Sequence, residues 1–172
     1  MKLDDNDFQL FGLPERFVLD RADLDARWRQ LQGSAHPDRF AAEGAAAQRL
    51  AMQWSVRINE AYRRLREPLT RAAYLCELRG APIAANTNTA MPADFLMQQM
   101  AWREALDEAH GDADLTALES QVSGAESDLL AQLKTLLDDK PEAAQAAERV
   151  RALMFIERFR NDLRERIDAL QD

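Results

Sequence analysis

The sequence predicts an all-α protein in which a helix hairpin is followed by a three-helix bundle. Three observations support this prediction. Apolar residues recur at helical spacing on both sides of the tripeptide His36-Pro37-Asp38. A stretch without this periodicity covers residues 81–92, and three further helical stretches follow it. No segment alternates apolar and polar residues as a half-buried strand does.

The first helix of the predicted hairpin lies before His36. Leu24, Trp28 and Leu31 are spaced i, i+4 and i+7, so they form one apolar stripe. Asp20 stands before this stripe at the position of an N-cap, where a carboxylate can accept hydrogen bonds from free backbone N–H groups. We therefore expect a helix that begins after Asp20.

The second helix of the hairpin follows the tripeptide, and its apolar stripe lasts four turns. The stripe comprises Leu50, Trp54, Ile58, Ala61, Tyr62 and Leu65. A short connection makes the two helices antiparallel neighbours, which places the tripeptide at the tip. Pro37 fixes its own φ and disfavours the helical conformation at the preceding residue, so the tip should be stiff. Trp28, Trp54 and Tyr62 are expected in the core.

A third, shorter helix should complete the first unit. Pro68 suits the first position of this helix and Gly80 suits the position just past its end. Its buried face would contain Leu69, Ala72, Ala73 and Cys76. The prediction for the whole chain is a first unit over residues 1–80, a linker over 81–92 and a three-helix bundle over 93–172.

The helices of the bundle are separated by His110-Gly111-Asp112 and by Asp138-Asp139-Lys140-Pro141. The middle helix has a seam with nearly heptad spacing, made of Leu115, Leu118, Val122, Ala125, Leu129, Leu133 and Leu136. The last helix has a similar seam, made of Ile156, Phe159, Leu163, Ile167 and Leu170. These seams should meet in the core of the bundle.

The first helix of the bundle, residues 93–110, is apolar on two sides. One face suits the core and carries Phe95, Trp102, Leu106 and Ala109. The opposite face, which should be polar, carries Leu96, Met97, Met100 and Ala101, bordered by Glu104, Asp107 and Glu108. In the last helix, Met154 and Phe155 also lie off the core stripe. Periodicity alone leaves two interpretations open: a partner-binding surface, or packing against the first unit or another bundle helix.

Composition narrows the classes of function. The single cysteine, Cys76, cannot form an internal disulfide, so we expect a reducing compartment and a buried thiol. One cysteine and two distant histidines do not make a zinc site, and we expect no metal and no cofactor. The acidic N-terminus does not resemble a signal or transit peptide, and no apolar run has membrane-spanning length. We expect a cytoplasmic, bacterial protein without a membrane partner.

Charge is divided unevenly along the chain. The formal net charge is −8, but residues 1–80 carry 13 basic and 12 acidic side chains, whereas residues 81–172 carry 9 and 18. Neither half has the basic surface of a nucleic-acid-binding protein, so we expect no nucleic-acid partner. The acidic half favours a protein partner with a basic patch.

The first unit resembles a J-domain, the module by which co-chaperones stimulate the ATPase of DnaK-type chaperones. The resemblance runs from about Phe8 to Gly80 and includes Phe8-Gln9-Leu10-Phe11-Gly12-Leu13, the tripeptide with Arg39-Phe40, and Ile58-Asn59-Glu60-Ala61-Tyr62. It implies that His36, Pro37 and Asp38 dock on the chaperone. Arg27, Arg29 and Arg39, the basic residues beside the loop, belong to this expected chaperone-binding site. Many J-domains have a more basic helix here, so docking should depend less on charge.

The second unit is similar to the HscB family, J-domain co-chaperones of iron–sulfur cluster assembly. The stretch from Phe95 to Glu108 carries this similarity, which extends over nearly the whole chain. It implies an HscA-type chaperone and the scaffold protein IscU as partners. The implied scaffold-binding residues are Leu96, Met97, Met100, Ala101, Glu104, Glu108 and Phe155. Ala101 stands where the family often has Glu, which removes one carboxylate from the rim.

The resulting expectation is an adaptor that performs no chemistry itself. The bundle would bind the scaffold and the J-domain would stimulate the chaperone ATPase, which promotes cluster transfer. Three alternatives remain: a J-domain protein with another client, an enzyme or metal protein, and a helical scaffold whose tripeptide is a plain polar turn. The enzyme finds little support because the sequence has no Gly-rich phosphate loop, nucleophile motif or clustered ligands.

Overall fold

The structure is a computed structural model that describes residues 1–171. It divides into two compact units, Met1–Leu75 and the residues from Cys76 onward. The described residues contain helices and loops and no strand, which confirms the predicted all-α class. Within these residues, no helix combines the length and the apolar character needed to cross a membrane.

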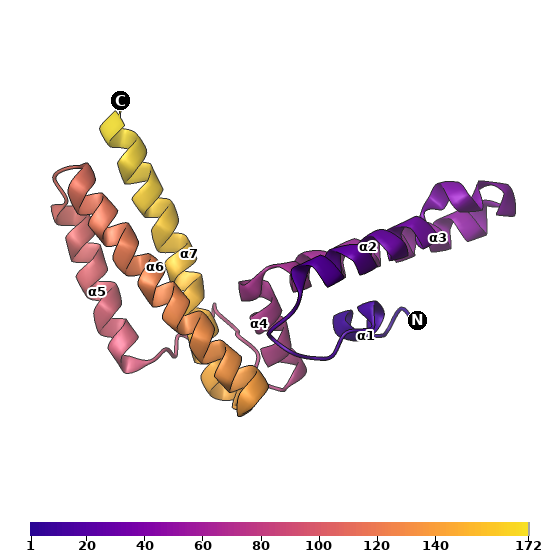
Figure 1. The fold of residues 1–172 in the computed structure, drawn as a ribbon, viewed down its shortest axis with the longest axis horizontal. Coiled ribbons are helices and arrows are strands. Elements are labelled where there is room, and N and C mark those ends of the chain that lie inside the picture. Colours follow the sequence, from indigo (N-terminus) through magenta and orange to yellow (C-terminus); the bar gives the residue numbers. More distant parts are fainter. Residues whose placement is uncertain (172) are drawn as a thin grey trace. The chain divides into compact units, whose positions relative to one another are not determined.

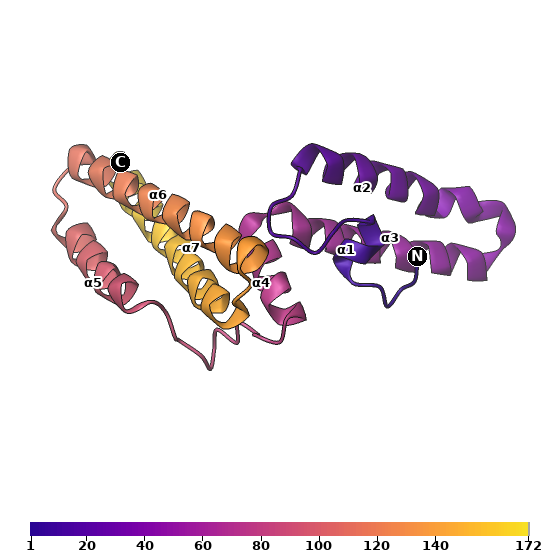
Figure 2. The same ribbon diagram turned by 60° about the horizontal axis from the view of Figure 1, so that its bottom comes forward.

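The first unit is built on a long helix hairpin. Its elements are α1 (Asp7–Phe11), α2 (Arg21–Ala35), the 3₁₀ segment η1 (Pro37–Glu43), α3 (Ala45–Arg66) and α4 (Pro68–Leu78), whose last turn passes the boundary between the units. Helices α2 and α3 lie side by side and are joined at one end by η1, as Figures 1 and 2 show. The predicted hairpin with the tripeptide at its tip is therefore confirmed.

Local signals start and stop these helices as predicted. The Asp20 carboxylate accepts hydrogen bonds from the N–H groups of Ala22, at 2.9 Å, and Asp23, at 3.3 Å. Pro68 is the first residue of α4. Gly80 has φ +79°, and the N–H of Ala81 returns to the Cys76 carbonyl at 2.9 Å, which satisfies one of the last carbonyls of the helix.

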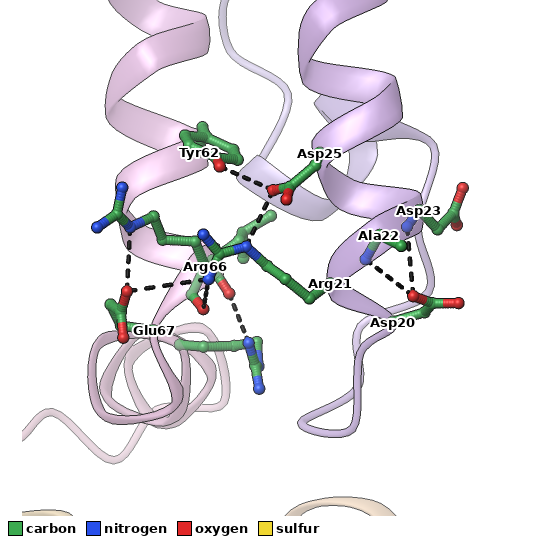
Figure 3. Close-up of polar contacts among 10 residues, drawn as sticks. Asp20, Arg21, Ala22, Asp23, Asp25, Tyr62, Arg66 and Glu67 are labelled. Atoms are coloured by element: carbon green, nitrogen blue, oxygen red, sulfur yellow. Dashed lines mark hydrogen bonds and ion pairs between the residues drawn. The ribbon is translucent and has the colours of Figure 1, made fainter.

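Helices α2 and α3 are held together by a small core and a polar cluster. Leu24, Ile58 and Leu65 have no exposed surface, and the rings of Trp28 and Tyr62 stack with centroids 4.6 Å apart. Figure 3 shows Asp25 of α2 accepting hydrogen bonds from the Tyr62 hydroxyl, at 2.7 Å, and from Arg21 Nε, at 2.9 Å. The hairpin is thus closed by contacts between residues almost forty positions apart.

The predicted core stripe of α3 is wrong at its start. Leu50 is 49% exposed, and Ala51 is buried in its place. Helix α3 contacts the short segment η1 as well as α2, so α2 alone does not set which side of α3 is buried. Trp28, Trp54 and Tyr62 are half-buried at the edge of the core.

The N-terminal helix α1 is anchored by the carboxylate of Asp7. From the sequence, this residue was considered only as part of an acidic N-terminus. Asp7 is fully buried and pairs with Arg57, at 2.8 Å, and Arg64, at 2.6 Å, both on α3. Its backbone N–H donates to the Tyr74 hydroxyl of α4 at 3.0 Å. This one residue therefore joins three helices of the first unit.

The second unit is a three-helix bundle, as predicted. It consists of α5 (Ala93–Glu108), α6 (Asp112–Lys134), a π-helical turn η2 (Thr135–Asp139) and α7 (Ala143–Gln171). The three helices run side by side in Figures 1 and 2. Its core includes Trp102, Leu115, Val122, Leu133, Ile156, Phe159 and Leu163. Residues 81–92, the predicted linker, form no helix.

The predicted seams are wrong at Leu170, and three further positions, Ala125, Leu136 and Ile167, are half-buried instead of buried. Leu136 is half-buried and Leu137 fills the core, because the π turn adds a residue to the last turn and rotates the following side chains. Leu170 is 46% exposed. Arg166 already lies level with the loop after α5, where it donates to the Ala109 carbonyl at 3.2 Å, so α7 continues past the helices it packs on.

Candidate partner-binding sites

The tip of the hairpin is an abrupt change of backbone direction. His36 ends α2 with φ −63° and ψ 130°, the extended conformation that the following proline favours. Pro37 then begins η1 as its first residue. The proline has no N–H to satisfy and a fixed φ, so this connection has little conformational freedom. The structure thereby confirms the expected tip geometry, whereas its binding role remains a prediction.

The side chains of the tip point into solvent and contact each other. The His36 and Asp38 side chains are 55% and 91% exposed, and His36 Nδ1 lies 3.5 Å from Asp38 Oδ2. His36 Nδ1 also accepts a hydrogen bond from the Asp38 N–H at 3.3 Å. The tip therefore presents an exposed imidazole beside an exposed carboxylate.

The three arginines of the expected chaperone-binding site have different surroundings. Arg39 donates to the Gly33 carbonyl at 2.9 Å, which fastens η1 to the end of α2. Arg29 is exposed. Arg27 is turned toward α1, where Nη1 donates to the carbonyls of Phe11, at 2.9 Å, and Gly12, at 3.2 Å. The structure thus brings Arg39 to the tip and gives Arg27 a role in holding α1.

The outer face of α5 carries a contiguous apolar patch. Leu96 is 46% exposed, and Met97 and Met100 are each 74% exposed. Ala101, Glu104 and Glu108 are exposed on the following turns of the helix. We call these six residues the α5 patch. Their exposure matches the wheel prediction, so they do not pack inside the bundle. Burying this apolar surface against a partner would be favourable, and methionine adapts to irregular surfaces.

The expectation that Phe155 lies off the core stripe is wrong. Only 5% of this residue is exposed, and its ring lies 5.8 Å from those of Phe95 and Phe159. The Arg103 guanidinium lies over the ring, 5.3 Å from its centroid. The physical reason is that α7 packs on both α5 and α6, so two of its stripes are buried. Phe155 lies in contact with the helix that carries the α5 patch.

Sequence reasoning missed two buried arginines, Arg71 and Arg151, and the second of them lies in the bundle. Arg151 is 6% exposed and donates hydrogen bonds to carbonyls of residues 82–90. The available signal was a single cation within the otherwise apolar stretch from Val150 to Ile156. Such a residue in a core-facing helix needs dedicated partners, because burying an unpaired charge is costly.

The described part of the chain has neither a candidate metal site nor an activated cysteine. Among the described residues, no cluster of three His, Cys, Asp or Glu side chains could hold a metal ion. Cys76 is buried, as predicted, and burial raises the pKa of its thiol to about 11. The thiolate is the reactive form of cysteine, so this side chain is inert near neutral pH.

Comparisons with known proteins agree with this geometry. A family model described as the HSCB C-terminal oligomerisation domain matches residues 91–164. The chain is 49% identical over 160 residues to a co-chaperone protein HscB homolog of Bordetella petrii, covering 92% of this chain and 94% of the relative. It is also 49% identical over 174 residues to the homolog of Burkholderia multivorans, covering 99% of both.

Solved structures of similar proteins match nearly the whole of this chain. The chaperone HscB from Vibrio cholerae matches with a TM-score of 0.81 and 38% identity over 96% of this chain and 99% of the other. Human co-chaperone protein HscB matches with a TM-score of 0.87 and 26% identity, covering 95% of this chain and 83% of the other. These matches include both the helix hairpin and the bundle.

Proposed function

The chain belongs to the HscB family of J-type co-chaperones, and on this basis we propose that it is an adaptor between two proteins of iron–sulfur cluster assembly. One partner is the scaffold protein IscU and the other is an HscA chaperone of the DnaK type. The adaptor binds the scaffold, delivers it to the chaperone and stimulates the chaperone ATPase in the cytoplasm. Cluster transfer from the scaffold follows from the ATP-driven step.

The hairpin tip is the proposed contact with the chaperone. Its support is the stiff backbone at Pro37 and the exposed imidazole and carboxylate of His36 and Asp38. Arg29 and Arg39 add positive charge beside the tip. The His36 and Asp38 side chains are largely exposed, so the tip lacks the enclosed cleft that acid–base catalysis needs. We therefore assign it a binding role and no chemistry of its own.

The α5 patch is the proposed contact with the scaffold. The single observation that carries this assignment is the exposure of Met97 and Met100 beside Leu96, on a face with no function in the bundle core. Glu104 and Glu108, the acidic residues of the patch, would meet basic residues of the partner. Phe155 supports the patch from below through Phe95, so its proposed contribution is largely indirect.

Steady-state ATPase activity of the cognate chaperone tests the proposal. The chaperone would be measured with this protein and with the scaffold, each alone and both together. His36→Gln should abolish the stimulation, because it removes the imidazole from the tip. Leu96→Ala/Met100→Ala should leave stimulation by this protein alone intact and remove the additional effect of the scaffold.

Leu170→Ala is a matched control, because Leu170 is as exposed as Leu96 and lies outside the patch. It should behave as the wild type. If ATPase stimulation requires His36 but is changed neither by the scaffold nor by the substitutions in the patch, the protein delivers another client. No stimulation by the wild-type protein would refute the co-chaperone mechanism as a whole.

A further inference from the structure

Arg151 is a buried cation that binds only backbone oxygens among the contacts described for it. Its Nε donates to the Ile83 carbonyl at 3.0 Å and its Nη1 donates to the Ala90 carbonyl at 3.0 Å. Its Nη2 lies 3.5 Å from the Pro82 carbonyl. A guanidinium stays charged and presents its donors in a rigid planar fork. One side chain of α7 therefore fixes both ends of a nine-residue segment.

The segment from Pro82 to Ala90 has little regular structure to hold it in place. Its internal contacts are a turn at Ala84, which has φ +45°, and a few hydrogen bonds such as that from the Asn88 N–H to the Ala84 carbonyl at 2.8 Å. Ile83 is buried beside the guanidinium contacts. The path of this segment thus depends on Arg151.

Helix α5 begins three residues after Ala90, and its start has few other anchors. The residue that precedes it, Pro92, provides no side-chain cap. In the first turn, the Phe95 ring packs against Phe155 of α7, with centroids 5.8 Å apart. Phe155 lies four residues after Arg151 and hence one helical turn away on the same side of α7. Arg151 and Phe155, which are neighbours on α7, therefore position the beginning of α5.

We propose that Arg151 is a positioning residue for partner binding: by holding residues 82–90 on α7, it sets where α5 begins and how the α5 patch is presented. Leu96 and Met97 follow Phe95 directly in the same turn, so a shift of this turn moves both side chains. This inference rests on the proposed binding of the scaffold at the patch. A surface held in its binding conformation loses less entropy on association.

The test compares two arginines of the same helix. Arg151→Leu removes the donors to residues 82–90. Arg160→Leu is the matched control, because Arg160 contacts α6 instead, through Ser123 Oγ at 2.9 Å and the carboxylates of Glu119 and Glu126. Each full-length variant would be measured for its melting temperature, for scaffold affinity by calorimetry, and for the methyl resonances of Met97 and Met100.

We expect both variants to melt at lower temperature than the wild type. Only Arg151→Leu should move the Met97 methyl resonance and weaken scaffold binding, by about tenfold. Arg151→Lys should recover part of the affinity, because an ammonium group can still donate to one or two of the carbonyls. A purely structural role would make the two leucine variants alike in affinity and in methyl spectra.

The two proposals fail in different ways. Unchanged methyl resonances in Arg151→Leu would overturn the positioning role whatever the scaffold does. Equal affinity of wild type and Arg151→Leu, with the scaffold bound by both, would also overturn it and leave the adaptor function intact. Absence of scaffold binding by the wild type would refute the adaptor function, and with it the binding role of Arg151.

Discussion

Asp25 shows how a single carboxylate can make the hairpin sensitive to pH. The hydrogen bond from the Tyr62 hydroxyl and then that from Arg21 lower the pKa of Asp25. Both donors favour the ionised form, which is therefore more stable in the folded chain than in the unfolded one. The unfolded value is about 4. The stabilisation is present above that pH and is lost as the pH falls through the lower, folded-state pKa.

This linkage predicts a pH-dependent effect of Asp25→Asn. The variant should melt at lower temperature than the wild type at pH 7, and the difference should shrink below about pH 4, because the wild-type carboxylate then becomes neutral as well. Melting curves between pH 7 and pH 2 would measure it. Asp4→Asn, on the exposed N-terminal residues, controls for the loss of one carboxylate. A difference in melting temperature between the wild type and Asp25→Asn that stays constant from pH 7 to pH 2 would contradict this role of the Asp25 carboxylate.

Helix α1 depends on contacts outside itself, because five residues form barely more than one turn and isolated helices of this length are unstable. Asp7→Ala should therefore detach α1 and destabilise the first unit by about 3 kcal/mol, since it leaves Arg57 and Arg64 without their buried partner. The lower end of the range for buried pairs applies because Arg64 is 43% exposed and can be hydrated.

Urea unfolding would measure this loss. Glu43→Ala, which removes an exposed carboxylate from η1, should change stability by less than about 0.5 kcal/mol. A loss at Asp7 no greater than that at Glu43 would show that α1 is held by its apolar contacts, such as the stacking of Phe8 on Tyr74 at 6.0 Å.

At the scale of the helices, features set by neighbouring residues were predictable from the sequence. The tip follows from the proline after His36, the start of α2 from Asp20, and the exposure of Met97 and Met100 from their place on the wheel. The binding roles of these side chains do not follow from their exposure. The sequence similarity supplied those roles, and they remain predictions.

Features that depend on distant partners were not predictable. Asp7 is buried because Arg57 and Arg64, which follow it by 50 and 57 positions in the chain, form ion pairs with it. Phe155 is buried because a second helix packs on α7, and no periodicity within α7 shows which of its faces that helix covers. The change of register at Leu137 comes from a π turn, for which the sequence offers no clear signal.

For the whole molecule, the proposed function requires both sites on one chain. A covalent connection raises the effective concentration of the bound scaffold near the chaperone. An equimolar mixture of His36→Gln and Leu96→Ala/Met100→Ala should therefore fail to restore the joint stimulation of the chaperone ATPase, although each variant retains one intact site. Chaperone ATPase activity, measured over a range of concentrations of the mixture and of the wild type, would test this expectation. Full activity of the mixture would mean that the two sites act independently.

The structure also separates residues that are free to vary from residues that are not. Leu96, Met97 and Met100 add little to the core, so substitutions there should leave the stability of the fold unchanged while they alter the proposed binding of a partner. Phe155 and Arg151 serve the fold as well, and a change at either affects both properties. If α5 binds the partner as proposed, affinity can diverge through exposed residues of this helix while the residues of the bundle core stay constant.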